Sequence, residues 1–260
     1  MSINSFSSVQ SFISKKKVVN QSSLLSPYLI VWYKFNGNLN NSAPNNLGKN
    51  NGTAISTGGG SQILTTISPS LSNNTTITNL CIFNGGGTSG GLVTYIDYGT
   101  ISNLILSQGF TICMFIYNTK TSGGEAYIHI LNQTASNIGN GNFDGGMNIY
   151  QNPFNAYRTF GFNNYGSVNY ATINQITWAH YAVTLKTNNT YSVYLNGVLT
   201  LSNLTNVGTY PTSTTFTNNL LGWYGPGGGH NSFKGNIADY RLYNTNLTGD
   251  QILAIYNSTL

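Results

Sequence analysis

The sequence predicts an all-β fold: a two-sheet antiparallel jelly-roll sandwich with a short C-terminal helix and an N-terminal arm. Three observations lead to this. From Tyr28 onward, short apolar runs alternate with turns rich in Gly, Asn, Ser and Thr. The run YSVYLNG alternates with a period of two and ends in a hairpin signal. A helical signature occurs only near the C-terminus. At 260 residues, the chain is long enough for one large β domain.

Residues 1–26 form the predicted arm, and residues 27–260 form the sandwich domain. The arm is rich in serine and carries the basic run Lys15, Lys16 and Lys17. We expect an assembly arm that lies along its own domain or along a neighbouring subunit. An address signal or a contact with a polyanion remains an alternative for so short a basic run.

Twelve segments that are apolar, aromatic or β-branched follow the arm, and each is bounded by turn residues. These predicted strands are Leu29–Phe35, Leu80–Phe83, Val93–Tyr98, Phe110–Tyr117, Ala126–Leu131, Gly146–Tyr150, Thr159–Phe162, Val168–Ala171, Trp178–Lys186, Thr190–Leu195, Asn219–Tyr224 and Gly235–Tyr243.

In Thr190–Leu195, Ser192 and Tyr194 share one face, and Tyr191, Val193 and Leu195 share the other. Asn196-Gly197 follows, and this pair favours a type I′ turn because both central residues of that turn need a positive φ. The predicted helix begins after Thr248, an N-cap with Gln251 at the capping-box position. Its apolar face consists of Ile252, Ile255 and Tyr256.

Only fifteen residues are charged, and this scarcity excludes several functions. No two of the five acidic residues lie closer than eleven positions, whereas glycoside hydrolysis usually needs a pair of carboxylates. The His and Cys residues lack metal-ligand spacing, and no Walker-type loop occurs. Outside the arm no basic stripe indicates nucleic-acid binding. No apolar run is long enough to span a membrane, so we expect no membrane insertion.

Cys81 and Cys113 both lie in apolar, strand-like segments. We interpret them as buried thiols, because free cysteine packs as a small hydrophobe. A disulfide between them stays open as the alternative. The N-terminal residues lack the order of a signal peptide, since the basic run follows the mildly apolar segment, so we do not expect standard secretion.

Several motifs occur together in a familiar order: LIVWYKFNGNLNNSAPN, LCIFNGG, TYIDYG, FTICMFIY, WAHYAVTL, YSVYLNGVLT, LLGWYGPGGG and FKGNIADYRLYNTNLTGDQILAIYN. The chain from about Tyr28 to Asn257 resembles concanavalin A-like, laminin G-like (LamG-like jellyroll) domains. The resemblance implies the sandwich fold of an exposed recognition module. The acid-rich strand of the glucanases in that superfamily is absent, so we predict no enzymatic activity.

Some members of the superfamily bind Ca²⁺ through an aspartate and backbone carbonyls. The corresponding positions here resemble Asn41 and Asn84, and amides weaken such a site. The resemblance therefore implies no cofactor, with Asp97 and Asp144 as weak candidates for anchoring Ca²⁺.

Two loops are candidate ligand-binding surfaces. The first contains Trp223, Tyr224 and His230 beside a Gly-rich backbone, which suits stacking on a sugar or contact with a protein partner. A core Trp followed by a loop tip is the alternative. The second, residues 140–165, offers amides, hydroxyls and an acid, and its alternative is a solvated sheet face. The predicted ligand-binding residues of the second surface are Asp144, Tyr157, Asn164 and Tyr165.

In FKGNIADYRLYN, strict alternation places Ile237, Asp239 and Arg241 on one strand face. We expect Asp239 and Arg241 to pair and lock the last strand to a neighbour, with a functional role as the alternative. His180 in WAHYAVTL is interpreted as a packed residue rather than a catalytic base.

The leading hypothesis is a structural surface protein of a virion, capsid- or fibre-associated, from a large DNA virus. Its expected partners are other subunits of the particle or copies of itself. The alternative is a carbohydrate-binding lectin or adhesin on an extracellular surface, with glycans as partners. A glucanase-like enzyme that uses Glu125 is the third hypothesis, and no nucleic-acid partner is expected.

Overall fold

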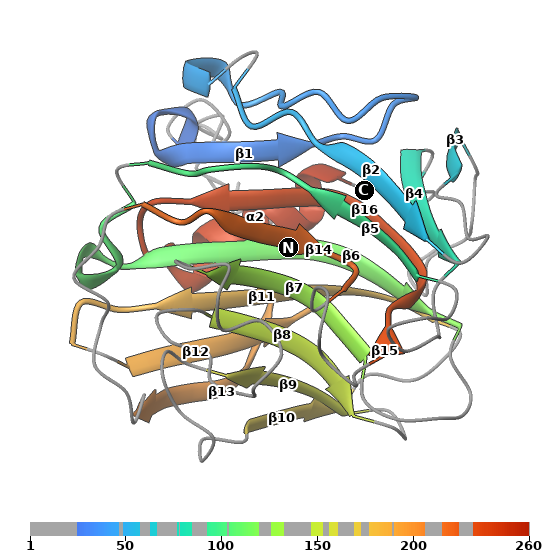
Figure 1. Ribbon diagram of the computed structural model, residues 1–260. Coiled ribbons are helices and arrows are strands. Elements are labelled where there is room, and N and C mark those ends of the chain that lie inside the picture. Colours follow the sequence, from blue (N-terminus) through green and yellow to red (C-terminus); the bar gives the residue numbers. More distant parts are fainter. Residues whose placement is uncertain are drawn as a thin grey trace, which may run out of the picture.

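The computed structural model describes residues 25–46, 49–57, 63–66, 77, 79–84, 93–102, 104–119, 126–132, 147–152, 156–160, 169–172, 177–188, 190–205, 215–223 and 231–259. The predicted two-sheet sandwich is confirmed, and Figure 1 shows the sheets stacked as two layers. Apart from one short parallel pair, the strands are antiparallel.

Sheet A lies at the back in Figure 1, and its strands pair in the order β13, β12, β11, β6, β16, β4 and β3, with β1 also paired to β16. Their bounds are β13 Val198–Thr205, β12 Thr190–Leu195, β11 Trp178–Leu185, β6 Phe110–Asn118, β16 Lys234–Tyr243, β4 Asn79–Asn84, β3 Ile63–Thr66 and β1 Leu29–Tyr33.

Sheet B faces the viewer in Figure 1 and has the order β10, β9, β8, β7, β14, β5 and β2, with β15 paired to β7. Their bounds are β10 Asn169–Thr172, β9 Ala156–Phe160, β8 Met147–Asn152, β7 Ala126–Asn132, β14 Asn218–Leu221, β5 Val93–Asp97, β2 Thr53–Thr57 and β15 Asn231–Ser232. Three short 3₁₀-helices, η1 Ser26–Tyr28, η2 Pro44–Asn46 and η3 Leu106–Gln108, lie in the connections.

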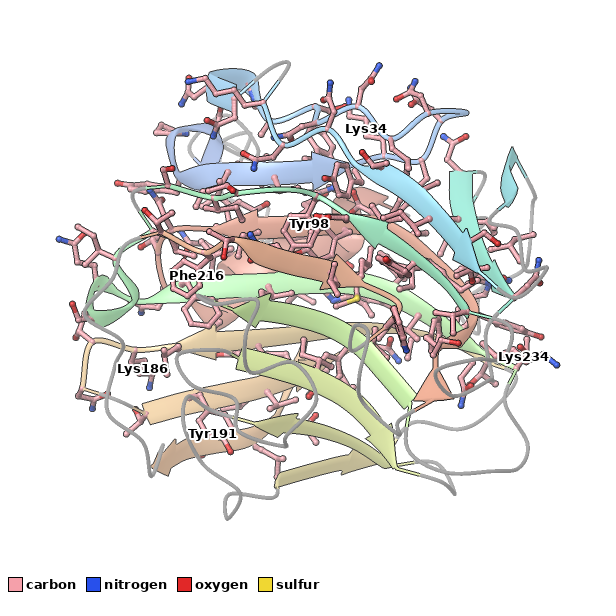
Figure 2. All side chains as sticks on the ribbon, viewed as in Figure 1. Lys34, Tyr98, Lys186, Tyr191, Phe216 and Lys234 are labelled. Carbon is pink, nitrogen blue, oxygen red and sulfur yellow. The ribbon has the colours of Figure 1, made fainter. Side chains whose placement is uncertain are left out.

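The main core fills the space between the sheets. Alternate residues along the strands point into it, as in β12, where Tyr191 and Val193 enter the core and Tyr194 lies on the opposite face. This confirms the predicted alternation. Three fully buried tyrosines, Tyr33, Tyr98 and Tyr240, pack with ring centroids 5.8–6.2 Å apart, and the hydroxyl of Tyr240 donates to that of Tyr98. Figure 2 shows Tyr98 between the layers.

The predicted helix is α2, Gly249–Thr259. Its capping box is present: the backbone N–H of Gln251 donates to the Thr248 hydroxyl, and the Thr248 N–H donates to the Gln251 side chain. The buried residues Ile252 and Ile255 pack α2 onto the outer face of sheet A. Leu25, which falls within the predicted arm, is buried in this same cluster. None of the described helices is long and apolar enough to cross a bilayer.

The predicted type I′ turn joins β12 to β13, with φ of 49° at Asn196 and 77° at Gly197. The Asn196 side-chain oxygen accepts the backbone N–H of His180, and the Asn196 backbone N–H donates to the His180 carbonyl. A Cβ at Gly197 would lie 2.7 Å from Leu253 Cδ1, so this turn packs tightly against α2.

The predicted strict alternation of faces along β16 is wrong. The register with β6 shifts between Ala238 and Arg241, and Asp239 has a φ of 48°, which marks a β-bulge. The bulge places Ile237 in the main core together with Tyr240, not on the face of Asp239 and Arg241. Because a bulge inserts one residue, every side chain beyond it changes face.

Candidate functional site

Of the residues predicted to bind a ligand, Trp223 has a described side chain, and it is buried, with 4% of its surface exposed. It therefore offers no open stacking face, and its burial agrees with the alternative of a core Trp. Tyr157 lies in β9, but its side chain is outside the described part. The other predicted residues also lie outside the described residues: Tyr224, His230, Asp144, Asn164, Tyr165 and the arm lysines Lys15, Lys16 and Lys17.

Gly222 sets the position of Trp223. Leu221 points into the core, and a Cβ at Gly222 would also point inward, 2.5 Å from the ring of Phe83. Two successive inward positions require a break in strand alternation, and Gly222 supplies it with a φ of 102°. Trp223 then packs against Tyr95 of β5, with ring centroids 5.0 Å apart.

Tyr95 belongs to a group on the outer face of sheet B that we call the β5 patch, consisting of Thr53, Ile55, Tyr95 and Asp97. Tyr95 and Asp97 are two residues apart on β5 and share a face, since Ile96 between them is in the core. On β2, Ile55 pairs with Tyr95 and Thr53 pairs with Asp97. Thr53 is exposed and the other three are half-buried, so this group is accessible to a ligand.

The β5 patch combines an aromatic ring, a hydroxyl and a carboxylate. Burial raises the pKa of Tyr95, and the Asp97 charge raises it further, so the phenol stays protonated at neutral pH. The Asp97 Oδ1 accepts the N–H of Gly99 at 2.8 Å, which fixes the carboxylate at the end of β5. Buried Trp223 supports the Tyr95 ring from the side.

Asp239 and Arg241 form a buried ion pair, which agrees with the predicted pairing. Arg241 Nη2 lies 2.7 Å from Asp239 Oδ2, and Arg241 Nε donates to Oδ1 at 2.9 Å. The indole N–H of Trp32 donates to the same Oδ1 at 2.6 Å, and Lys34 Nζ lies 4.0 Å from the Trp32 ring centroid. Because Trp32 belongs to β1, this arrangement joins the first strand to the last.

His180 is buried on the outer face of sheet A, between Phe115 of β6 and Tyr256 of α2. Neither ring nitrogen has a hydrogen-bond partner among the described residues. Burial lowers the pKa of His180 to about 3, with Asp239 raising it and Arg241 lowering it to smaller extents. A neutral, enclosed imidazole agrees with the packed role predicted for His180.

Asn41 is buried and does not suit a calcium ion. Its Oδ1 accepts the N–H groups of Trp32 and Ala43, and its Nδ2 donates to the carbonyls of Ile30 and Lys49 at 2.9 and 3.0 Å. The amide nitrogen thus occupies the space that these carbonyls face, and Ca²⁺ requires oxygen ligands there. Within the described ranges, no three His, Cys, Asp or Glu residues are grouped to hold a metal.

Cys81 and Cys113 are free and buried, so the thiol interpretation is confirmed. Cys81 belongs to the core between the sheets, and Cys113 to the cluster beneath α2. Burial raises the pKa of Cys113 to about 12, which makes this thiol unreactive at neutral pH.

Sequence reasoning assigned Tyr95 to a strand but not to a site, and did not predict β2. The available signal was the spacing in TYIDYG, where an aromatic and an acid two residues apart share one face of a strand. Which face was exposed depended on pairing between strands distant in sequence, and this pairing has no local signature.

Three solved structures illustrate the similarity of the fold. Domain 4 of the arabinanase AbnA from Geobacillus stearothermophilus, in complex with arabinotriose, is 18% identical, with a TM-score of 0.59 over 88% of this chain and 98% of that one. A structure of botulinum neurotoxin type C, a toxin whose cell entry depends on interaction with two ganglioside molecules, is 15% identical. Its TM-score is 0.57 over 92% of this chain and 53% of the toxin chain. Trypanosoma rangeli sialidase in complex with sialic acid is 15% identical, with a TM-score of 0.51 over 72% of this chain and 29% of the sialidase chain.

The chain thus spans nearly all of the arabinanase domain, but only about half of the toxin chain and under a third of the sialidase. No curated protein matches it. The model of the concanavalin A-like lectin/glucanases superfamily matches residues 89–253, more than half of the chain. These residues run from just before β5 into α2 and include most strands of both sheets. The chain belongs to the concanavalin A-like lectin/glucanases superfamily.

Proposed function

We propose that this protein is a non-enzymatic recognition module that binds carbohydrate at the β5 patch. The observation that carries the proposal is the half-buried ring of Tyr95, which lies beside the Asp97 carboxylate and is supported by Trp223. Tyrosine on a rigid strand presents a large apolar face with little conformational freedom to lose on binding.

A sugar ring has an apolar face of C–H groups and a rim of hydroxyls, and the β5 patch matches both. The Tyr95 ring provides a packing surface for the apolar face. The Asp97 carboxylate accepts hydroxyl hydrogens in charge-assisted hydrogen bonds, and the Thr53 hydroxyl both donates and accepts. So small a surface predicts weak binding, with a Kd in the range of about 0.1–10 mM.

The similar structures support the ligand class, because one is a complex with arabinotriose, one belongs to a toxin that interacts with gangliosides, and one is a complex with sialic acid. Each is less than 20% identical to this chain, so the choice of site rests on the residues described above. The proposal involves no catalytic step: the acids with described positions are Asp97, Asp239 and Asp250, of which Asp239 is held by Arg241 and Asp250 lies in the first turn of α2.

Isothermal titration calorimetry with arabinotriose and lactose, following a glycan-array screen, tests the proposal. Wild type should bind, and Tyr95→Ala should bind at least tenfold more weakly. Tyr28→Ala is the matched control, since Tyr28 is 47% exposed on η1 and its carbonyl accepts the N–H of Asn244, next to β16 of sheet A; its loss should leave affinity unchanged. Failure of wild type to bind any array glycan or 10 mM of either sugar would contradict the proposal, as would equal binding by Tyr95→Ala.

Composition favours a second, compatible role on the surface of a particle. Charge normally keeps free proteins apart, and only 6% of residues here are charged. We propose that the chain packs against neighbouring subunits in a virion, with residues 1–26 as the assembly arm. Mass spectrometry of purified particles should find it there, and recovery only as free protein from producing cells would refute this role.

A further inference from the structure

Of the six Lys and Arg residues in the described ranges, four lie in strands of sheet A or directly after them. Lys34 follows β1, Lys186 follows β11, and Lys234 begins β16. Figure 2 shows these three lysines at different edges of the molecule. Arg241 also belongs to β16, and its charge is matched by Asp239. Lys49 lies in the loop before β2 with an exposed side chain, and its neighbour Asn50 donates to the carbonyls of Tyr98 and Thr100, so Lys49 lies near the end of β5.

The strands around the β5 patch carry a single charge. The sequences of β2, β5 and β14 are TAIST, VTYID and NNLL, and Asp97 is their only ionisable acid or base apart from the protonated Tyr95. Among the described residues, no Lys or Arg forms an ion pair with Asp97. The ion pair that these residues do form joins Arg241 to Asp239 in β16.

Within the described strands of sheet B, the next cation is too distant to compensate for Asp97. Arg158 lies in β9, which is separated from β5 by β14, β7 and β8. At a strand spacing of about 4.8 Å, the β9 backbone is roughly 19 Å from β5. Charges at that separation are largely screened, because the Debye length at physiological ionic strength is about 8 Å.

We infer that the β5 patch takes neutral sugars and discriminates against acidic sugars, of which sialic acid is the example among the similar structures. The inference rests on the proposed carbohydrate-binding function and narrows its ligand class. An acidic sugar brings a second carboxylate next to Asp97, which repels it, and none of the four residues of the β5 patch is a cation that could offset this repulsion. A neutral sugar instead places hydroxyl donors on Asp97, which accepts their hydrogen bonds.

The repulsion has a definite expected size. Two like charges several ångströms apart at a protein surface change affinity by about tenfold. The substitution Asp97→Asn removes that repulsion with little effect on the fold. An asparagine oxygen still accepts the Gly99 N–H that the carboxylate now accepts, so the turn at the end of β5 is retained.

The experiment compares lactose with 3′-sialyllactose, which differ by one acidic sugar, and uses arabinotriose as a second neutral probe. Titration calorimetry is carried out at 20 mM and 300 mM NaCl on wild type, Asp97→Asn and the control Tyr28→Ala. Wild type should bind lactose or arabinotriose about tenfold more tightly than 3′-sialyllactose at low salt. High salt and Asp97→Asn should each narrow this difference to threefold or less, whereas Tyr28→Ala should preserve it.

The outcomes separate the inference from the proposed function. If 3′-sialyllactose binds wild type as tightly as the neutral sugars or more tightly, the neutral ligand class is wrong while carbohydrate binding stands. A preference that Asp97→Asn leaves unchanged also overturns the inference, because Asp97 is then not its cause. If none of the three sugars binds at 10 mM, the inference fails together with the proposed function. Thermal unfolding confirms that each variant is folded.

Discussion

His180 makes the stability of this protein depend on pH in a way that one substitution can isolate. The neutral imidazole is enclosed by Phe115 and Tyr256, and protonation would place an unpaired charge between sheet A and α2. Its pKa is 6.5 in the unfolded chain and about 3 in the fold, so the unfolded state binds a proton more readily over that interval. Stability therefore falls as the pH decreases from 6.5 towards 3.

The size of the effect follows from these two pKa values. Each pH unit between them lowers the free energy of unfolding by about 1.4 kcal/mol. Relative to pH 7.5, His180 should reduce it by about 2 kcal/mol at pH 5 and about 3 kcal/mol at pH 4. The comparison at pH 5 is the cleaner one, because ordinary carboxylates are still mostly ionised there.

The assay is urea unfolding followed by tryptophan fluorescence at pH 7.5 and pH 5, on wild type, His180→Leu and His180→Gln. Both variants lack the titrating ring. Between pH 7.5 and pH 5, the free energy of unfolding of each variant should therefore fall by about 2 kcal/mol less than that of wild type. In wild type, one imidazole resonance should remain neutral down to pH 4 and should disappear in His180→Leu. An equal pH dependence in all three proteins would refute the reasoning.

Four further predictions concern packing and metal. Asn41→Ala should lower the free energy of unfolding by about 3 kcal/mol, measured by urea titration, because it leaves buried N–H and carbonyl groups unpaired; a loss under 1 kcal/mol would show that water replaces the amide. Arg241→Ala should cost about 3–5 kcal/mol by isolating the buried Asp239 charge, and adding Asp239→Ala should recover part of the loss; an additive double mutant would argue against the pair. Gly222→Ala should destabilise by about 2–4 kcal/mol through its positive φ and the contact with Phe83, and a thermal midpoint equal to that of wild type would contradict the close packing. EDTA or 5 mM CaCl₂ should leave the thermal midpoint unchanged, and a rise with Ca²⁺ would reveal a site that the described residues do not form.

The fold could be predicted from sequence because its main signals are local. The alternation in β12, the Asn196-Gly197 turn and the Thr248 capping box each depend on neighbouring residues, and the structure contains all three. Strands β2, β3 and β13 and the two-residue β15 were not predicted. The sequences of the first three, TAIST, ILTT and VLTLSNLT, lack a long apolar run, and their pairing partners define them as strands.

The candidate site was less accessible to sequence reasoning, for two physical reasons. Trp223 was predicted to begin a ligand-binding loop, with a core Trp as the alternative. The positive φ of Gly222 turns its side chain onto Tyr95, where it is buried. The bulge at Asp239 changed which residues share a face in β16. In both cases a single residue with a positive φ changed which sheet face the following side chains occupy. A prediction that assumes strict alternation cannot detect such a change.

The amide of Asn41 has a consequence for how this protein behaves in a crowded solution. The backbone groups of β1 that point away from β16 are a template on which a foreign strand can pair. The N–H of Trp32 is bonded to Asn41, its carbonyl accepts from Ser42, and the Ile30 carbonyl accepts from Asn41, so the protein's own loop occupies this margin of the sheet. Many proteins guard such margins with lysines. In a chain with so few charges, a neutral side chain that mimics a neighbouring strand gives the same protection against aggregation.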